Sequence, residues 1–444
     1  MELPGGRARG ASGVVNVSST RGGTRQLPLA DALLGGTAPD SGLFVPAPFP
    51  ERALRPRAGG TLADSALAML GPFFAGDRLA GALAAMVAEA FTFPAPLVPL
   101  RGTKDFVVEL FHGPTAAFKD FGARFLAACV RRLHPPGSGT RTVLVATSGD
   151  TGSAVAAAFH RMDDVRVVLL YPDGRVSPRQ AHQLGAFGDN VSALRVAGSF
   201  DTCQAMVKAA FADPELAPLR LTSANSISLG RLLPQLAYHA HAAWASADTL
   251  NLIVPTGNLG NAVAAVWARQ LGAPIGDIVL ATNANRTLEE FFEGAAYRGR
   301  PSVPTLANAM DVGDPSNFER LSWTYPDPGV LRRNVRARSV SDEQISRTIQ
   351  EGERRHGKVF CPHTAAAVHV LEEIRAAPGG RTGTWAVAAT AHPAKFESIV
   401  EPLVGHPVEV PPGLAELLAR PSRAEALPAE AGALRRWLLD HAGG

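Results

Sequence analysis

Short apolar runs of the strand type alternate with segments of helical composition from residue 142 onward. Six runs have this character, at residues 142–147, 166–171, 192–197, 251–255, 277–281 and 384–389. Such alternation is typical of parallel sheets whose two faces are covered by helices. We therefore predict an α/β fold, and we expect its functional residues at the carboxyl ends of the strands.

The two ends of the chain have different patterns. Residues 14–95 contain small strands and an alanine-rich helical stretch at 65–91, which predicts an N-terminal cap region. Residues 1–12 are expected to form a loose tail. Prolines and glycines at 301–329 predict a long irregular segment, and the proline pair at 411–412 opens a polar helical tail.

One lysine, Lys119, lies in the segment HGPTAAFKDFG at residues 112–122. The chain has thirty-eight arginines but only five lysines, at positions 104, 119, 208, 358 and 395, so its composition disfavours lysine wherever a generic cation would serve. A partly desolvated lysine amine can lose its proton and condense with an aldehyde, whereas a guanidinium stays protonated. Lys119 is therefore a candidate reactive amine, and the alternative is a surface lysine at a helix start.

Two glycine-containing loops join an expected strand to an expected helix. One covers residues 148–151 (SGDT), and the other covers residues 257–261 (GNLGN). Glycines let the backbone approach an anion closely, and the amides at a helix N-terminus attract it. A phosphate suits the second loop and a short carboxylate suits the first, although glycine also serves turn geometry alone. Neither loop has the G-x-G-x-x-G or G-x-x-x-x-G-K-[ST] spacing, which argues against NAD and ATP.

Six segments, taken in order, resemble the motifs of the threonine synthase family, which belongs to the fold-type-II pyridoxal phosphate enzymes. They are HGPTAAFKDFG at 112–122, TSGDTG at 147–152, SANSIS with Arg231 at 223–231, PTGNLGN at 255–261, NAMDVGDPSN at 308–317 and TAHPAKF at 390–396. The segments STRG at 19–22, SGLFVP at 41–46 and FTFPAP at 91–96 resemble the opening of the family's longer, microbial and yeast-like subgroup. The resemblance covers about residues 14 to 404, and six ordered motifs are more specific than any one of them.

The resemblance implies an α/β, fold-type-II enzyme with two parallel-sheet lobes, helices on both faces of each sheet, and a cleft that can close on a substrate. The smaller lobe, with the TSGDTG loop, is expected at residues 138–250. The larger, cofactor-binding lobe is expected at 96–137 with 251–444, and the tail and cap at 1–95.

The resemblance further implies a reaction in which O-phospho-L-homoserine and water give L-threonine and phosphate, by γ-elimination and β-addition of water. Pyridoxal 5'-phosphate would be the electron sink, and Lys119 would hold it as a Schiff base and then move protons among the substrate carbons. The other cofactor-binding residues that the motifs imply are Asp150, Gly257, Asn258, Leu259, Gly260, Asn261 and Thr390, whose hydroxyl would face the pyridine nitrogen. The residues implied for the substrate are Ser148, Gly149 and Thr151 at its carboxylate, and Asn225, Ser226 and Arg231 at its phosphate.

Two positions depart from the family pattern. Ser228 stands where asparagine is common, and Asn261 stands where aspartate is frequent. Each departure is expected to alter a hydrogen bond at the edge of the site and to leave the reactive amine intact. Asp150 occupies the place where many related pyridoxal enzymes put an asparagine against the ring oxygen of the cofactor, although this subgroup itself resembles SGDTG.

Histidines and cysteines indicate no metal chemistry. His112 and His392 lie inside motifs, where we expect them to bond backbone groups and shape the pocket, and His363 is expected to start a helix. The three cysteines, at positions 129, 203 and 361, are widely spaced and form no C-x-x-C pair. We therefore expect neither a zinc site nor a disulfide framework, and a reducing compartment fits.

Composition indicates a large enzyme that acts on a small molecule. A formal charge of +3 on 444 residues, without a dense basic run, is too small to indicate nucleic acid. The sequence has no run of eighteen apolar residues and no signal-peptide pattern, so we expect a cytoplasmic protein without a membrane span. We expect a monomer or a homodimer.

Two other functions remain open from the sequence. A sibling lyase would eliminate phosphate from a phosphorylated amino acid and release a keto acid with ammonia, and it would need the same grip on phosphate. A non-catalytic pyridoxal phosphate-binding protein would have no reason to retain Lys119, Gly257 and Arg231 together.

Overall fold

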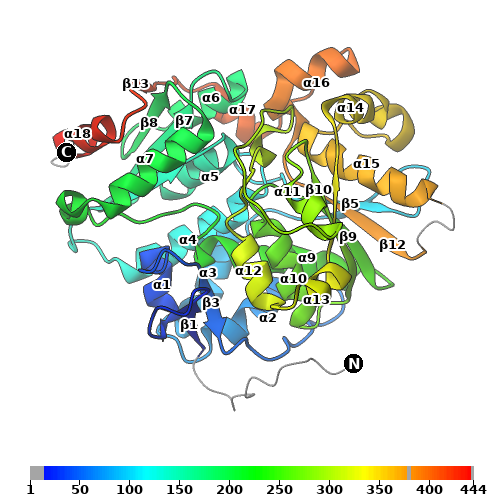
Figure 1. Ribbon diagram of the computed structural model, residues 1–444, viewed down its shortest axis with the longest axis horizontal. Helices are drawn as coiled ribbons and strands as arrows, with labels where there is room; N and C mark the ends of the chain where they lie inside the picture. The colour runs from blue at the N-terminus through cyan, green and yellow to red at the C-terminus, as the bar shows by residue number, and fades with distance from the viewer. Residues whose placement is uncertain (1–14, 378–381, 442–444) are drawn as a thin grey trace.

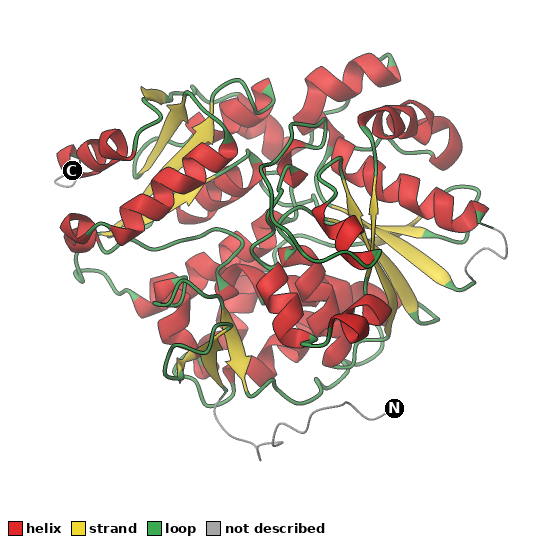
Figure 2. Ribbon diagram, viewed as in Figure 1, coloured by secondary structure: helices red, strands yellow, loops and turns green. Residues whose placement is uncertain are grey.

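The computed structural model describes residues 15–377 and 382–441, and the expected tail at 1–12 lies outside the described residues. Within these ranges the strands form three sheets, of three, six and four strands. Figures 1 and 2 show the six-stranded and four-stranded sheets in two neighbouring lobes, with the N-terminal elements packed beside them. The predicted α/β class, with two parallel-sheet lobes and a cap, is therefore the architecture of the chain.

The larger lobe is built on the six-stranded sheet, with the order β11-β10-β9-β12-β5-β4. Its strands are β4 (Leu97–Pro99), β5 (Phe106–Glu109), β9 (Leu250–Pro255), β10 (Ile275–Thr282), β11 (Arg336–Ser339) and β12 (Thr384–Ala389). All neighbours pair in parallel except β4, which runs antiparallel to β5 at the edge.

Side chains of β9 alternate between two cores. Leu252 and Val254 pack with helices α9 (Gln235–Ala245) and α10 (Gly260–Gln270) on one face. Ile253 packs on the other face with α14 (Asp342–His356) and α15 (Pro362–Ala376). Because successive strand residues point to opposite faces and both faces are buried, residues 252–255 form an unbroken apolar run.

The smaller lobe is built on a wholly parallel sheet of order β13-β8-β7-β6. Its strands are β6 (Arg141–Ala146), β7 (Val165–Pro172), β8 (Val191–Val196) and β13 (Glu425–Leu427). Helix α5 (Asp150–Phe159) packs in the core on one face, and α7 (Phe200–Ala212) and α18 (Ala431–Asp440) pack in the core on the other. Helix α6 (Pro178–Gly185) adjoins α5.

Helix α4 (Lys119–Leu133) connects the two lobes. Its residues Phe121 and Phe125 belong to the core of the larger lobe, whereas Leu126 and Val130 belong to the core of the smaller lobe. Since both faces of the helix are fixed by packing, the position of its first residue, Lys119, is fixed relative to both sheets.

The cap consists of a small antiparallel sheet and three α-helices. Its elements are β1 (Asn16–Ser19), β2 (Leu27–Pro28), β3 (Phe44–Ala47), α1 (Leu29–Gly35), α2 (Leu62–Phe74), η1 (Ala80–Ala82) and α3 (Leu83–Ala90). Thr61 and Asp64 form a reciprocal capping box that fixes the start of α2. Buried cap residues, including Met69 and Phe73, join the core of the larger lobe. The cap therefore extends that core.

The remaining helices are short and lie between or after these elements. They are η2 (Pro214–Leu219), α8 (Leu229–Leu232), α11 (Thr287–Phe292), η3 (Asn308–Met310), α12 (Phe318–Thr324), α13 (Pro328–Asn334), η4 (Pro393–Phe396), α16 (Glu397–Val404) and α17 (Pro412–Leu418). In the described ranges no helix is both long and apolar enough to cross a membrane.

All six predicted strand runs correspond to strands, with ends that differ by no more than two residues. The structure differs from the expected division at two places. Strand β13 pairs with β8, so the chain returns to the smaller sheet after residue 424. Helices α8 and α9 pack in the core of the larger lobe, although 138–250 was expected to form the smaller one. Both differences arise because packing, and not chain order, decides where a helix or a three-residue strand docks.

Candidate active site

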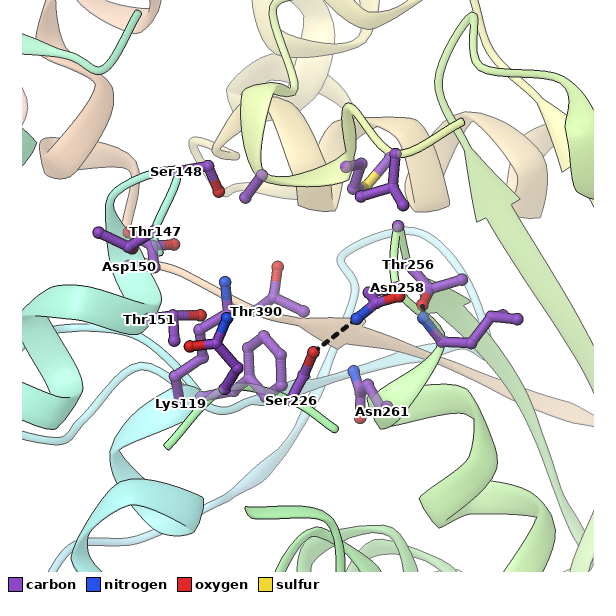
Figure 3. A pocket seen from close by; sticks show the side chains of 18 of the residues that line it. Lys119, Thr147, Ser148, Asp150, Thr151, Ser226, Thr256, Asn258, Asn261 and Thr390 are labelled. Carbon is purple, nitrogen blue, oxygen red and sulfur yellow. Dashed lines mark hydrogen bonds between the residues drawn. The ribbon is translucent and has the colours of Figure 1, made fainter. Parts of the chain in front are cut away.

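Segments of both lobes surround a cavity that holds about 900 Å³ of empty space, including solvent at its open mouth. Its walls come from the carboxyl ends of β6, β9 and β12, the first residues of α4, and the segment around η3. Thirteen of the fourteen residues predicted for the site line it: Lys119, Ser148, Asp150, Thr151, Asn225, Ser226, Arg231, Gly257, Asn258, Leu259, Gly260, Asn261 and Thr390. Gly149 does not line the cavity, and it caps the helix that begins there. Figure 3 shows the wall with Lys119, Asp150 and Thr390 on one side and that with Thr256, Asn258 and Asn261 on the other.

Lys119 is held at the start of α4 by contacts with the end of β12. The Phe118 amide donates to the Thr390 carbonyl over 2.8 Å, and Ala116 adopts a left-handed backbone with φ of 55°. Burial lowers the pKa of the Lys119 amine to about 8, opposed by the Asp150 carboxylate and assisted by the cations of Arg231 and Lys395. A sizeable fraction of this amine is therefore neutral at mildly alkaline pH.

The loop before α5 is organised around Thr147. Its hydroxyl accepts the amides of Gly149 and Gly152 over 3.0 and 2.8 Å. Gly149 has φ of 123°, which only glycine adopts without strain, and an added Cβ would lie 2.7 Å from Nε2 of Gln180. Gly149 at the N-cap has no side chain to cap the helix, and the amides of Asp150 and Thr151 have no hydrogen-bond acceptor among the described residues.

Asp150 is bound by a buried lysine that the sequence reasoning passed over. Its Oδ1 accepts from Nε2 of Gln180 over 2.9 Å and lies 2.8 Å from Nζ of Lys395. The side chain of Lys395 is fully buried and also donates to the Thr115 carbonyl over 2.8 Å. Burial opposes ionisation of Asp150, but the ammonium groups of Lys395 and Lys119 outweigh it and hold the pKa of the carboxyl well below its usual range. Two features of the sequence could have identified Lys395: it is one of only five lysines, and it lies in the motif TAHPAKF at 390–396.

The loop before α10 presents backbone amides instead of a charged side chain. Leu259 adopts a left-handed backbone with φ of 63°, its amide bonds the Thr256 hydroxyl over 3.1 Å, and no side chain caps the helix. A Cβ at Gly257 would lie 2.8 Å from Cα of Met310, so only glycine fits there. These features suit the phosphate of pyridoxal phosphate, because uncapped amides at a helix N-terminus bind anions.

Residues of the NAMDVGDPSN motif hold this second loop in place. The Asn258 side chain donates to Oγ of Ser226 over 2.8 Å and accepts from the Ser316 amide over 2.6 Å. Nδ2 of Asn317 donates to the Asn258 carbonyl over 2.8 Å. The predicted cofactor and substrate loops are thus joined through one asparagine.

Arg231 is buried in the cavity wall and is only 2% exposed, so it is not a solvated helix arginine. It donates to the Ala224 carbonyl, while its Nε has no hydrogen-bond partner in the described part of the chain. Burial lowers the pKa of its guanidinium to about 10, and no ion pair to it is found among those residues. A buried cation without a paired anion is costly unless a ligand supplies the charge.

Both departures from the family pattern leave a buried polar atom without a partner. Oδ1 of Asn261 accepts from the Tyr238 hydroxyl over 2.7 Å and lies 2.8 Å from Nε2 of His239, while its Nδ2 is unpartnered within the described residues. Oγ of the fully buried Ser228 is likewise unpartnered among them. The two departures thus each leave one side-chain group, Nδ2 of Asn261 and Oγ of Ser228, without a hydrogen bond among the described residues.

The histidines have structural contacts, but one of them also reaches the cavity. Nδ1 of His392 accepts the Ala394 amide over 3.2 Å, and His112 lies 2.9 Å from Glu109. His363 begins α15 as expected, lines the cavity, and accepts the Ala309 amide at Nε2 over 3.0 Å. Burial lowers its pKa to about 4, so it is neutral near pH 7. No feature of the sequence indicated that this histidine would line the same cavity as Lys119.

No group of three or more potential metal ligands occurs within residues 15–377 and 382–441, and the three cysteines are free and buried. The site therefore consists of a lysine, two helix N-termini, a buried arginine and a buried ion pair.

Comparisons with known proteins agree with this arrangement. Residues 89–390 match the family described as pyridoxal-phosphate dependent enzyme, residues 16–91 match the threonine synthase N terminus, and residues 364–437 match the threonine synthase C-terminal family. The chain is 36% identical to the threonine synthase of Haemophilus influenzae over 96% of this chain and 100% of that protein. It is 38% identical to the threonine synthase of Escherichia coli over 94% of this chain and 97% of that protein.

Solved structures give the same result. The crystal structure of Escherichia coli threonine synthase matches with a TM-score of 0.86 and 34% identity, over 96% of this chain and 100% of that chain. The pyridoxal phosphate-bound threonine synthase of Brucella melitensis matches with a TM-score of 0.85 and 33% identity, over 97% of this chain and 100% of that chain. The chain belongs to the threonine synthase family of pyridoxal phosphate-dependent enzymes.

Proposed function

We propose that this enzyme takes O-phospho-L-homoserine and water as substrates and releases L-threonine and inorganic phosphate. The observation that carries the proposal is Arg231, a buried cation with an unpartnered Nε in the wall of the cavity that contains Lys119. A phosphate ester on the substrate would supply the missing anion, and guanidinium is well suited to it because its planar fork donates two hydrogen bonds at once.

The cofactor-binding residues are Lys119, Asp150, Gly257, Asn258, Leu259, Gly260, Asn261 and Thr390. Pyridoxal phosphate, when bound, withdraws electrons from the substrate carbons and makes their protons acidic. The N-terminus of α10 would hold its phosphate, Thr390 would serve its ring nitrogen, and Asp150 would serve its ring oxygen. This assignment is supported by the left-handed backbone of Leu259 and by the close approach of Gly257 to Met310, which excludes a side chain at that position.

The substrate-binding residues form two groups. Ser148, Gly149 and Thr151 bind the substrate carboxylate at the N-terminus of α5, where the amides of Asp150 and Thr151 have no hydrogen-bond acceptor within the described residues. Asn225, Ser226 and Arg231 bind the substrate phosphate. Nε of Arg231 lacks a hydrogen-bond partner within the described residues, which supports a role of this guanidinium toward an anion.

Lys119 acts as the base that moves protons among the substrate carbons. Its amine has a pKa of about 8, close to the pH at which a general base is both deprotonated and basic enough. His363 is less suited to this role, because burial lowers its pKa to about 4 and its Nε2 is occupied by the Ala309 amide.

We also propose a cytoplasmic location and a monomeric or homodimeric chain with three regions, namely the cap and the two lobes. The three free, buried thiols support a reducing compartment. Light scattering of the purified chain tests the oligomeric state, and a tetramer or larger assembly would contradict it.

The reaction is tested by incubating the purified chain with O-phospho-L-homoserine and measuring phosphate, threonine and 2-oxobutyrate together. Equal amounts of phosphate and threonine are expected. Phosphate with 2-oxobutyrate would instead identify a lyase, and cofactor absorbance without any product would identify a binding protein or a different substrate.

A further inference from the structure

A buried ion pair joins the two lobes, and its carboxylate lines the same cavity as Lys119. Lys395 belongs to η4, which follows β12 in the larger lobe, whereas Asp150 begins α5 in the smaller lobe. The side chain of Lys395 is 0% exposed, and that of Asp150 is 4% exposed. Hydrogen bonds fix both partners: Lys395 donates to the Thr115 carbonyl, and Gln180 donates to Asp150.

Neighbouring contacts reinforce the same joint. Oγ of Ser177 donates to the Lys395 carbonyl over 2.5 Å, and Arg179 donates to the Ala394 carbonyl over 2.7 Å. The N-terminus of α6 is therefore docked on η4, which holds the ammonium of Lys395 opposite Asp150. Removing either charge would leave the other buried and uncompensated, an arrangement that is strongly unfavourable.

The charges that face Lys119 come from four other elements. Asp150 of α5 favours its protonated form, while Arg231 of α8 and Lys395 of η4 disfavour it. His363 of α15 also interacts with Lys119 and is neutral. On its own helix, Asp120 is turned to Thr115, whose amide and hydroxyl it accepts over 2.9 and 2.7 Å.

We propose that Lys395 is a positioning residue of the cofactor site, whose ammonium neutralises Asp150 and thereby keeps the Lys119 amine free to react with the cofactor aldehyde. This role rests on the assignment of Lys119 to the cofactor made above. In the reaction the neutral amine attacks the aldehyde carbon, a C=N bond replaces the C=O bond, and the oxygen leaves as water with both amine protons. Without Lys395, the Asp150 carboxylate would pair with a protonated Lys119 and remove the nucleophile.

The charge arrangement predicts opposite effects for two near-isosteric substitutions. Lys395→Met leaves an unpaired carboxylate beside Lys119, so the pKa of Lys119 rises. Asp150→Asn leaves an unpaired ammonium, so the pKa of Lys119 falls. The double variant removes both charges together, so the pKa returns toward that of the unmodified chain.

The test measures how fast the full-length, cofactor-free chain captures added pyridoxal phosphate, followed by visible absorbance as a function of pH. The rate should rise with pH as Lys119 loses its proton, and the pH of half-maximal rate is the midpoint. We expect this midpoint to move up by about 1 pH unit in Lys395→Met and down by about 1 pH unit in Asp150→Asn, as for a single nearby charge. The double variant is expected within about 0.3 pH unit of the unmodified chain, since its net charge there is the same. Lys358→Met is the matched control, because Lys358 pairs with Glu109 over 2.6 Å away from the cavity lining and should leave the midpoint unchanged.

The proposal is overturned if the two single variants move the midpoint in the same direction, or if capture slows without any shift, since both results indicate a purely structural ion pair. If Lys395→Met does not fold, Asp150→Asn and the double variant still decide the question through their difference. Lys119→Ala separates this test from the cofactor assignment: covalent capture that persists in Lys119→Ala overturns the assignment itself. None of these readouts depends on threonine formation.

Discussion

The two strand–loop–helix units that line the cavity start alike and differ in charge. In both, a buried strand leads through a glycine loop into a helix without a side-chain cap. The α5 unit places a carboxylate, Asp150, in its first turn and pairs it with the buried Lys395. The α10 unit has no acidic residue in its first turn and presents the neutral Asn261.

This difference indicates how two similar helix N-termini can serve different ligands. A carboxylate in the first turn already interacts with the partial positive charge of the helix, so less of it remains for a second anion. In the proposed site the α10 amides bind a doubly charged phosphate, whereas the α5 unit binds a singly charged carboxylate and its Asp150 adjusts the protonation of Lys119. A glycine loop before a helix therefore does not by itself identify the anion that binds there. The charge of the side chain in the first turn of the helix also matters.

Removing the amine that lies between the two units should have the largest effect. Lys119→Ala should abolish covalent attachment of the cofactor and lower turnover by at least about 10²–10⁴-fold, the usual contribution of a general base. Turnover and visible absorbance measure the two effects. An active variant with unchanged absorbance would move the reactive amine elsewhere, and Lys104→Ala, at an exposed lysine, is the control.

The second prediction asks whether Arg231 serves the substrate or the cofactor. Arg231→Ala should lower kcat/KM. The corresponding loss of transition-state stabilisation should be about 1.5–3 kcal/mol for each charge-assisted hydrogen bond lost to the substrate phosphate. The affinity for pyridoxal phosphate should change little, because in the proposed site the α10 amides, and not Arg231, bind the cofactor phosphate. Titration with pyridoxal phosphate and steady-state kinetics separate the two, and equal losses would assign Arg231 to the cofactor.

Alanine at the two loop glycines should disturb the two units in different ways. Gly149→Ala forces a φ of 123° on a residue with a Cβ, at a cost of about 1–3 kcal/mol in the free energy of unfolding. It also displaces the amide of Gln180 that bonds Asp150. Gly257→Ala pushes on the backbone of Met310 and should mainly weaken pyridoxal phosphate binding. Urea denaturation and cofactor titration measure these effects. Equal losses of stability and of cofactor affinity in both variants would contradict the expected difference between the two loops.

Much of this site could be predicted from the sequence, because its loops follow strands with strong local patterns. The runs that became β6 and β9 place the two glycine loops at the carboxyl ends of strands in two different sheets, and Lys119 was marked by the scarcity of lysine. The pairing of Asp150 with Lys395 could not be predicted, since it joins residues 245 positions apart on different lobes. Strand β13 was missed for a similar reason, because a three-residue strand carries too little local signal to reveal its partner β8.

The smallest predicted effect concerns the neutral first turn of α10. Asn261→Asp would give this unit a carboxylate like that of α5, but one without a lysine partner. The new carboxylate could accept from the Tyr238 hydroxyl and from Nε2 of His239, and the unpartnered Nδ2 would be gone. We expect the cofactor-free chain to gain about 1 kcal/mol in the free energy of unfolding, from a satisfied buried group and a favourable helix-end charge.

The same substitution should weaken cofactor binding slightly, because a negative charge is added beside the phosphate loop. Urea denaturation of the cofactor-free chain and titration with pyridoxal phosphate measure the two effects with opposite expected signs. A loss of stability without cofactor would mean that burying the carboxylate costs more than the orphaned amide does. In that case the neutral residue at 261 stabilises the helix start by itself, and the contrast between the two units would extend from ligand binding to folding.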